Sequence, residues 1–171
     1  MVSSKRGIPE DSLANSYLPV NYYDVIDYTT GNLNNITADD IQTAFWTVMP
    51  KSVERLFKIR NFLVKPFGLK SGNENRGEIR KCIETGGSSG MFAVLGKTPN
   101  ETLLRLDDKH LQAYISVYLQ STNTDERNIR AITLVKFHSW LGYVYFYAIM
   151  PFHRIVVKRM LKFTVNNLIN S

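Results

Sequence analysis

The chain has 171 residues, which is enough for one well-buried core and short for two. Hydrophobic residues make up 44% and charged residues 21%, the composition of an ordinary globular protein. The net charge is +6, but the basic residues follow no zinc-finger, arginine-rich or RNA-binding-sheet pattern, so we expect no nucleic-acid partner.

A single cysteine, Cys82, excludes a disulfide framework and favours a cytoplasmic location. Residues 1–11 contain no apolar run, so no signal peptide is predicted. The most apolar window, Trp140–Val157, is interrupted by Pro151 and Arg154. We therefore expect a buried helix there and no transmembrane span.

The first third of the chain predicts a strand followed by two helices. Residues 1–20 are polar and irregular, and we expect a loosely held segment. Residues 21–28 are rich in Tyr, Val and Ile and predict a strand. Thr37 followed by two aspartates predicts a capped helix as far as Pro50, and a second helix follows from Lys51.

The next segment predicts a short strand at Glu78–Glu84 and a flexible hairpin connection at Gly86–Gly90. From Met91 onwards the apolar residues recur with a period of two. Four strands follow with short turns between them, at residues 91–97, 101–106, 110–120 and 127–138. Short turns between consecutive strands predict an antiparallel meander.

The strand at 110–120 has the clearest alternation. One face carries Leu111, Ala113, Ile115, Val117 and Leu119, and we expect this face to meet the terminal helix. In the strand that follows, Ile132 and Leu134 blur the same pattern.

The end of the chain, Ser139 to Asn170, predicts a long amphipathic helix that contains Pro151. Such a helix is about 45 Å long, enough to cross a small domain. The predicted fold class is α+β: a curved antiparallel sheet wrapped around this C-terminal helix, with two helices after the first strand. The order of elements resembles the helix-grip proteins (Bet v 1, START and polyketide-cyclase types). We expect one domain over residues 1–171.

Four motifs carry a closer resemblance: Pro66–Lys70, His110–Leu111, Phe137–Tyr145 and Pro151–Val156. Together they resemble a bacterial family of uncharacterised proteins, domain of unknown function 2867, over residues 22–161. Some members of that family are fused behind a Rossmann-type dehydrogenase domain, which implies an oxidoreductase partner. The family implies no established activity.

The chain departs from the family pattern at two places. Gln112 stands where members often have an acid, and Ser139–Trp140 stand where they often have Asn-Arg. A polar site built on those positions would be altered in this chain.

The three histidines are His110, His138 and His153, and their spacing matches no local metal motif. A zinc site would require the fold to bring them together. We expect neither a metal nor another cofactor, and no residue set predicts a catalytic nucleophile.

The leading hypothesis is a domain that binds a small hydrophobic molecule between the sheet and the terminal helix. The candidate ligand-binding residues are Arg105, His110, Tyr114, His138, Trp140, Tyr143, Tyr145, Phe152 and His153. One alternative is a cyclase-like or hydratase-like enzyme that uses the same cavity, and another is a structural or partner-interaction module. No pattern indicates an oligomeric state.

A basic stripe recurs every four residues along the terminal helix, at Arg154, Lys158 and Lys162. We interpret it as a solvated face, with an anionic partner or a membrane surface as the alternative.

Overall fold

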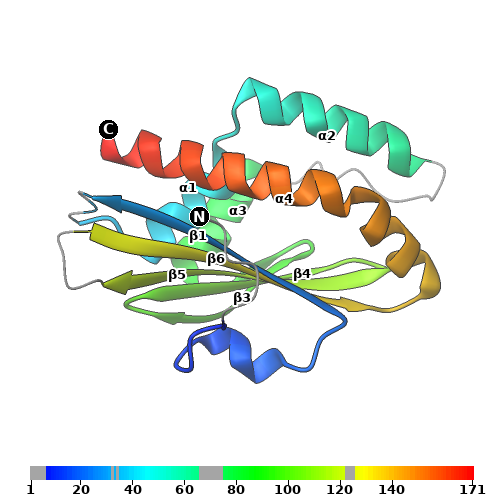
Figure 1. Ribbon diagram of the computed structural model, residues 1–171, viewed down its shortest axis with the longest axis horizontal. Coiled ribbons are helices and arrows are strands. Elements are labelled where there is room, and N and C mark those ends of the chain that lie inside the picture. Colours follow the sequence, from blue (N-terminus) through cyan, green and yellow to red (C-terminus); the bar gives the residue numbers. More distant parts are fainter. Residues whose placement is uncertain (1–6, 32, 34, 66–74, 122–125) are drawn as a thin grey trace.

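The computed structural model of the chain describes residues 7–31, 33, 35–65, 75–121 and 126–171 (Figure 1). The motif at residues 66–70 lies outside the described residues. The elements in chain order are η1 (Leu13–Tyr17), β1 (Tyr22–Gly31), α1 (Ala38–Thr47), α2 (Lys51–Val64), α3 (Arg76–Thr85), β2 (Ser88–Ser89), β3 (Phe92–Thr98), β4 (Glu101–Asp107), β5 (Leu111–Ser121), β6 (Glu126–Phe137) and α4 (Trp140–Ile169).

The strands form one six-stranded antiparallel sheet in the order β1-β6-β5-β4-β3-β2. The strands from β2 to β6 are neighbours in sequence and in space, so the predicted meander is confirmed. Strand β1 adds at the edge beside β6. The predicted fold class is confirmed, because the sheet is covered by a C-terminal helix of 30 residues.

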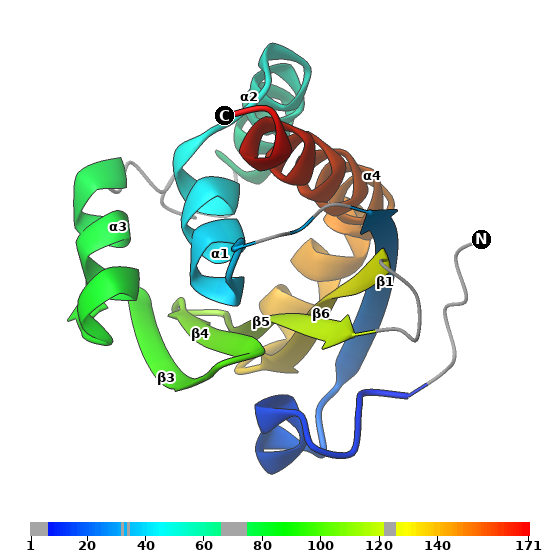
Figure 2. The ribbon, with the colours of Figure 1, turned by 90° about the vertical axis from the view of Figure 1, so that its left-hand side faces the viewer.

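The α-helices α1 to α4 lie on one side of the sheet, and we call the face on that side the inner face (Figure 2). Helix α3 contacts β3, α1 contacts β4 and β5, and α4 contacts β6 and β1. Helix α2 packs on α4. Figure 1 shows that α4 bends in its first half, the half that contains Pro151. A proline removes one backbone hydrogen bond of a helix and is a common cause of such bends.

The inner core is built from alternate residues of the central strands. Val117 and Leu119 of β5 pack in one cluster with Val157, Leu161 and Val165 of α4, as the alternation predicted. Nearer the start of α4, Leu111 packs against Tyr145. The predicted inner set of β5 therefore does face the terminal helix.

A second core lies on the opposite face of the sheet, which we call the outer face. Ile132 and Leu134 of β6 are buried there with Ala14 of η1. This burial explains why their alternation is blurred, because a strand covered on both sides has apolar residues at every position.

The N-terminal segment differs from the expectation of a loosely held stretch. Ser12 Oγ and the backbone N–H of Leu13 each donate a hydrogen bond of 2.7 Å to the carboxylate of Glu101. Ser116 Oγ donates to the same carboxylate, and Glu101 is 1% exposed. A buried carboxylate requires such donors, so polar contacts hold residues 12–13 on the outer face.

The segment predicted as a strand at Glu78–Glu84 is instead helix α3. Asn75 caps the helix, since its side chain accepts a hydrogen bond from Gly77 N. Ile79, Cys82 and Ile83 fall at helical spacing and are buried. The prediction was wrong because so short a segment offers too few apolar residues to separate a period of two from one of 3.6.

The glycines after α3 end that helix and take part in a short hairpin, because β2 pairs antiparallel with β3 and Gly90 (φ 56°) lies in the connection between them. Gly86 ends the helix in the left-handed conformation (φ 71°), and its N–H donates to Cys82 O. Glycine adopts this conformation without strain, which makes it the usual residue after a helix.

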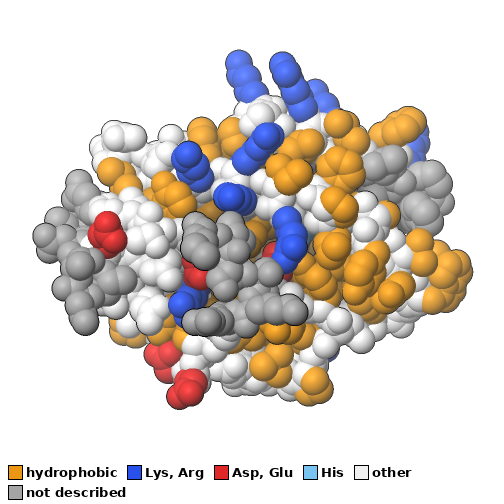
Figure 3. Space-filling model, in the orientation of Figure 1, with side chains coloured by type: hydrophobic (Ala, Val, Ile, Leu, Met, Phe, Trp, Pro, Cys, Tyr) orange, Lys and Arg blue, Asp and Glu red, His pale blue; other side chains and the backbone are white. Residues whose placement is uncertain are grey.

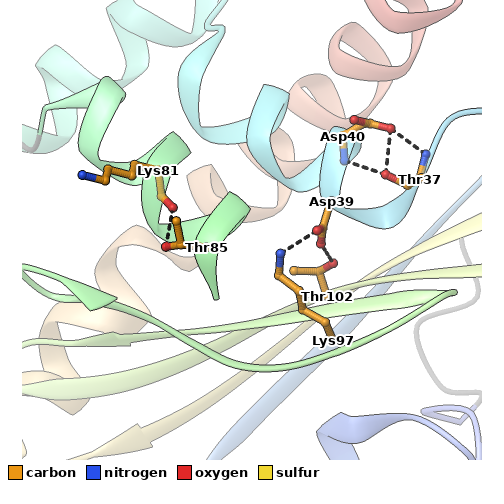
Figure 4. A network of polar contacts seen from close by, with 7 residues as sticks. All are labelled: Thr37, Asp39, Asp40, Lys81, Thr85, Lys97 and Thr102. Carbon is orange, nitrogen blue, oxygen red and sulfur yellow. Dashed lines mark hydrogen bonds and ion pairs between the residues drawn. The ribbon is translucent and has the colours of Figure 1, made fainter. Parts of the chain in front are cut away.

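Helix α1 is fixed at its N-terminus by two sets of contacts, drawn in Figure 4. Thr37 and Asp40 form the predicted capping box, in which each side chain accepts a hydrogen bond from the backbone N–H of the other residue. Asp39 pairs with Lys97 Nζ of β3 at 2.6 Å and accepts a hydrogen bond from Thr102 Oγ1 of β4. These contacts tie α1 to the sheet and set the distance between them.

Candidate functional site

A cavity of about 120 Å³ lies between the inner face of the sheet, α1 and α4. It forms beside Ala131 of β6, whose small side chain stands opposite Val117 of β5 in the strand register. The lining residues come from four elements and the α1–α2 connection: Gln42, Phe45, Trp46, Met49, Ile115, Val117, Ala131, Thr133, His153, Val156, Val157 and Met160.

The size of the cavity lies between a packing defect and an ordinary ligand pocket. Packed protein interiors leave few voids larger than one water molecule. Pockets for drug-sized ligands measure roughly 300–1,000 Å³, whereas an engineered apolar cavity of about 150 Å³ binds benzene. A volume of about 120 Å³ therefore suits a molecule of one small ring or a short branched chain.

Three residues of the apolar lining carry buried polar atoms without a hydrogen-bond partner in the structure: Gln42 Oε1, Trp46 Nε1 and His153 Nε2. The other end of the Gln42 amide is satisfied, because Nε2 donates to Ile115 O at 3.1 Å. Most buried polar atoms in proteins are paired, so three unpaired atoms on the residues of one lining are unusual. They offer an acceptor, a donor and one imidazole nitrogen.

His153 is held neutral. Burial lowers its pKa below the ordinary value of 6.5, Asp24 opposes that shift, and Arg154 adds to it. The next residue fixes the position of the ring, since Arg154 Nη2 and Nε lie 3.0 Å and 3.2 Å from the two carboxylate oxygens of Asp24. The imidazole can donate or accept one hydrogen bond, but it carries no charge at neutral pH.

Of the nine predicted ligand-binding residues, only His153 lines the cavity. Tyr145 is buried nearer the start of α4, against Leu111. Trp140, Tyr143 and Phe152 are exposed on the outward side of the same helix.

Two further predicted residues lie on the outer face of the sheet. Arg105 and Tyr114 are opposite each other in the register of β4 and β5. The ring of Tyr114 lies 4.5 Å from that of Tyr17, and its hydroxyl donates to Gln112 Oε1. Gln112 in turn donates to Asp107, so the position where the family often has an acid takes part in a network outside the cavity.

The fold does not bring the three histidines together. His138 Nε2 lies 3.4 Å from Asp107 Oδ1, His110 Nδ1 lies 3.4 Å from Ser139 Oγ, and His153 lines the cavity. Within the described part of the chain, no group of three His, Cys, Asp or Glu side chains is placed to hold a metal ion.

The motif around Phe137–Gly142 forms the joint between β6 and α4. Ser139 caps α4 by accepting a hydrogen bond from Gly142 N, and His138 N donates to His110 O at 2.9 Å. A side chain at Gly142 would place its Cβ 2.1 Å from His110 O. The motif therefore fixes the start of α4 against the β4–β5 turn.

The sequence prediction missed the contribution of α1, which supplies Gln42, Phe45 and Trp46. One signal was present. Gln42 stands at a position of the buried stripe of α1, four residues after Ala38 and three before Phe45, where an apolar residue is expected. A fully buried polar side chain on such a stripe indicates a site.

Comparison with known proteins gives one match. A sequence model of the family described as protein of unknown function (DUF2867) matches residues 17–160. No curated protein and no solved structure matches the chain. Among the described residues, no helix combines the length and apolarity needed to span a membrane.

Proposed function

The chain belongs to the DUF2867 family, and we propose that it binds a small, mainly apolar molecule in the cavity between the sheet and α4. The observation that carries this proposal is the coincidence of an apolar cavity with three unpaired buried polar atoms. A ligand with one polar group could satisfy several of these atoms at once. It would thereby remove the desolvation cost that each unpaired atom imposes on the fold.

The chemistry of the three atoms narrows the class of ligand. Gln42 Oε1 requires a donor, Trp46 Nε1 requires an acceptor, and His153 Nε2 accepts either role. A hydroxyl group both donates and accepts, whereas a carboxylate only accepts and would meet a neutral imidazole. We infer a neutral ligand of ring size that carries a hydroxyl or a similar group, with phenol as the simplest probe.

A calorimetric titration with phenol tests the proposal. We expect binding with a dissociation constant on the order of 0.1–1 mM, which is reasonable for a ligand of seven heavy atoms. Ala131→Leu fills the cavity and should abolish binding, while Ala113→Leu on a neighbouring strand is the matched control outside the lining. Palmitate should not bind in the cavity, because its chain exceeds the volume.

The result that would reject the proposal is an absence of heat of binding for phenol and for a panel of similar ring-sized neutral molecules. Binding that survives Ala131→Leu in a folded protein would place the ligand elsewhere. Circular dichroism of each variant establishes that the fold is intact.

An enzyme that uses the same cavity is the second candidate. Burial lowers the pKa of His153 and its Nε2 is unpaired, so this nitrogen could act as a general base. Among the described residues that line the cavity, His153 is also the one ionisable side chain. Acid-base catalysis usually pairs two titrating groups with separated pKa values, so the lining favours binding over turnover. Conversion of a bound hydroxylated ligand, lost in His153→Gln, would favour the enzyme.

A further inference from the structure

The outward face of α4 is apolar over about its first four turns. Six of the eleven exposed large hydrophobic residues in the described part of the chain lie on this helix, and two more lie on α2. Figure 3 shows that apolar side chains gather at the end of the molecule where α4 begins. The eight residues are Trp140, Tyr143, Val144, Tyr147, Phe152 and Ile155 of α4 with Ile59 and Phe62 of α2.

Such a patch is unusual for a face in contact with water only, and Trp140 and Phe62 are 73% and 78% exposed. The composition of the patch is informative. Tryptophan and tyrosine are enriched where proteins meet the lipid–water interface, because their rings are apolar and their tips polar.

Basic residues continue the same face of α4. At 3.6 residues per turn, Lys158 and Lys162 fall in line with Val144 and Ile155, and both lysines are exposed. The 30 residues of α4 contain no aspartate or glutamate. The outward side therefore changes from apolar to basic along one helix.

Helix α2, which packs on α4, repeats this combination. Phe62 shares its exposed face with Lys51, Arg55, Lys58 and Lys65, and Glu54 is the one acid of the helix. Figure 3 shows basic side chains above and beside the apolar patch. A second copy of the chain would bring these like charges together, which costs free energy, whereas an anionic surface would complement them.

We propose that these exposed faces of α2 and α4 form a docking surface for an anionic phospholipid bilayer. The aromatic rings enter the interfacial region, and the lysines and arginines meet the phosphate and carboxylate groups of the lipid heads. Both helices lie on the membrane surface and do not cross it. This inference does not depend on a ligand in the cavity, because none of the eight patch residues lines it.

Vesicle co-sedimentation tests the proposal. The full chain should sediment with vesicles of an equimolar mixture of phosphatidylcholine and phosphatidylserine, and less with phosphatidylcholine alone. One double variant is Trp140→Ser with Tyr143→Ser, and the other is Lys158→Glu with Lys162→Glu. Each should lower the constant for partitioning onto the vesicles about tenfold or more. Raising the salt concentration should weaken binding of the wild type.

Each variant has a matched control. Tyr23→Ser removes an equally exposed aromatic ring from β1, and the pair Arg76→Glu with Lys81→Glu changes the charge of α3 by the same amount. Both controls should bind as the wild type does.

Two results would overturn the proposal. In one, the folded wild type stays in the supernatant with both vesicle types, or both double variants bind the vesicles as well as the wild type does. In the other, sedimentation equilibrium without lipid shows a dimer that the Trp140 and Tyr143 substitutions dissociate. The patch would then be a contact between copies of the chain.

Discussion

The side-chain amide of Gln42 donates a hydrogen bond to the backbone carbonyl of Ile115 across 3.1 Å, and this bond joins α1 to the central strand β5. It also fixes the orientation of the amide, whose Oε1 is left buried and unpaired. We therefore expect Gln42 to distinguish ligands that can donate a hydrogen bond from ligands that cannot.

The first prediction compares phenol with toluene, which has nearly the same shape but no hydroxyl. Gln42→Leu should weaken phenol binding by about fivefold, since a hydrogen bond to a buried acceptor contributes about 1 kcal/mol. Toluene binding should be unchanged or slightly tighter. The exposed Gln120→Leu on β5 is the control. An equal loss for both ligands would show that Gln42 only maintains the shape of the cavity.

The second prediction concerns the pH dependence of stability. Because burial lowers the pKa of His153 in the folded state, the unfolded chain takes up the proton first as the pH falls. The stabilising contribution of the neutral ring is present above the ordinary pKa of about 6.5 and is lost as the pH falls through it. Urea unfolding measures the free energy of unfolding at about pH 7.5 and about pH 5.5. The loss between these two pH values should be smaller for His153→Gln than for the wild type.

Above that window the two proteins provide their own control, because His153 is neutral in both the folded and unfolded states. Their free energies of unfolding should run parallel between about pH 7.5 and 8.5. If the free energy of unfolding of His153→Gln falls with pH below pH 7 as steeply as that of the wild type, the burial of a neutral His153 is contradicted.

The third prediction concerns the ion pair between Arg154 and Asp24. The Asp24 side chain is 3% exposed and its partner 48%, so the carboxylate depends on the guanidinium for its hydrogen bonds. Asp24→Asn should lower the free energy of unfolding by about 2 kcal/mol. The control is Asp27→Asn, whose partner Arg130 lies 2.8 Å away. The Asp27 carboxylate is 24% exposed, so this substitution should cost about 1 kcal/mol or less. Equal costs would show that burial of Asp24 has no special effect.

The fourth prediction concerns the glycine at the start of α4. Alanine is favoured over glycine inside a helix by about 1 kcal/mol, so an unconstrained Gly142→Ala would stabilise the protein. We expect the opposite sign, with a loss of about 2 kcal/mol or more, because the new Cβ would collide with the backbone oxygen of His110. Thermal unfolding of Gly142→Ala beside Gly77→Ala in α3 measures the difference. A melting temperature for Gly142→Ala at or above that of the wild type would refute the close contact.

The order of elements could be predicted because most elements carry a clear period. The alternation of Leu111 to Leu119 identified both the strand and its inner face. Helix α3 was misassigned because its ten residues bury only Ile79, Cys82 and Ile83. The outer core was missed for a different reason. Ile132 and Leu134 stand among other apolar residues, so the sequence shows that both faces of the strand are buried. It does not show which segment covers the second face.

The residues that line the cavity are harder to predict from the sequence, because a helical period defines two faces but not which of them meets the sheet. The aromatic residues near the start of α4 suggested a pocket, yet Trp140 and Tyr143 point outward and His153, about three turns later, lines the cavity. Gln42 lies 111 residues before His153 (153 − 42), and only the packing of α1 beside α4 brings both to one cavity.

The most direct test of ligand binding uses methionine methyl groups as reporters. The chain has five methionines, and two of them, Met49 and Met160, line the cavity. Met91 and Met150 lie outside the lining and serve as controls within the same molecule. Methyl resonances of protein labelled with ¹³C at these positions can be followed during a titration with phenol.

If phenol occupies the cavity, the resonances of Met49 and Met160 shift together and saturate at the dissociation constant measured by calorimetry, while those of Met91 and Met150 stay in place. Ala131→Leu should remove the shifts. Two results would contradict ligand binding between the sheet and α4. In one, phenol shifts the resonance of Met91 or Met150. In the other, none of the four methionine resonances shifts at phenol concentrations well above the dissociation constant from calorimetry.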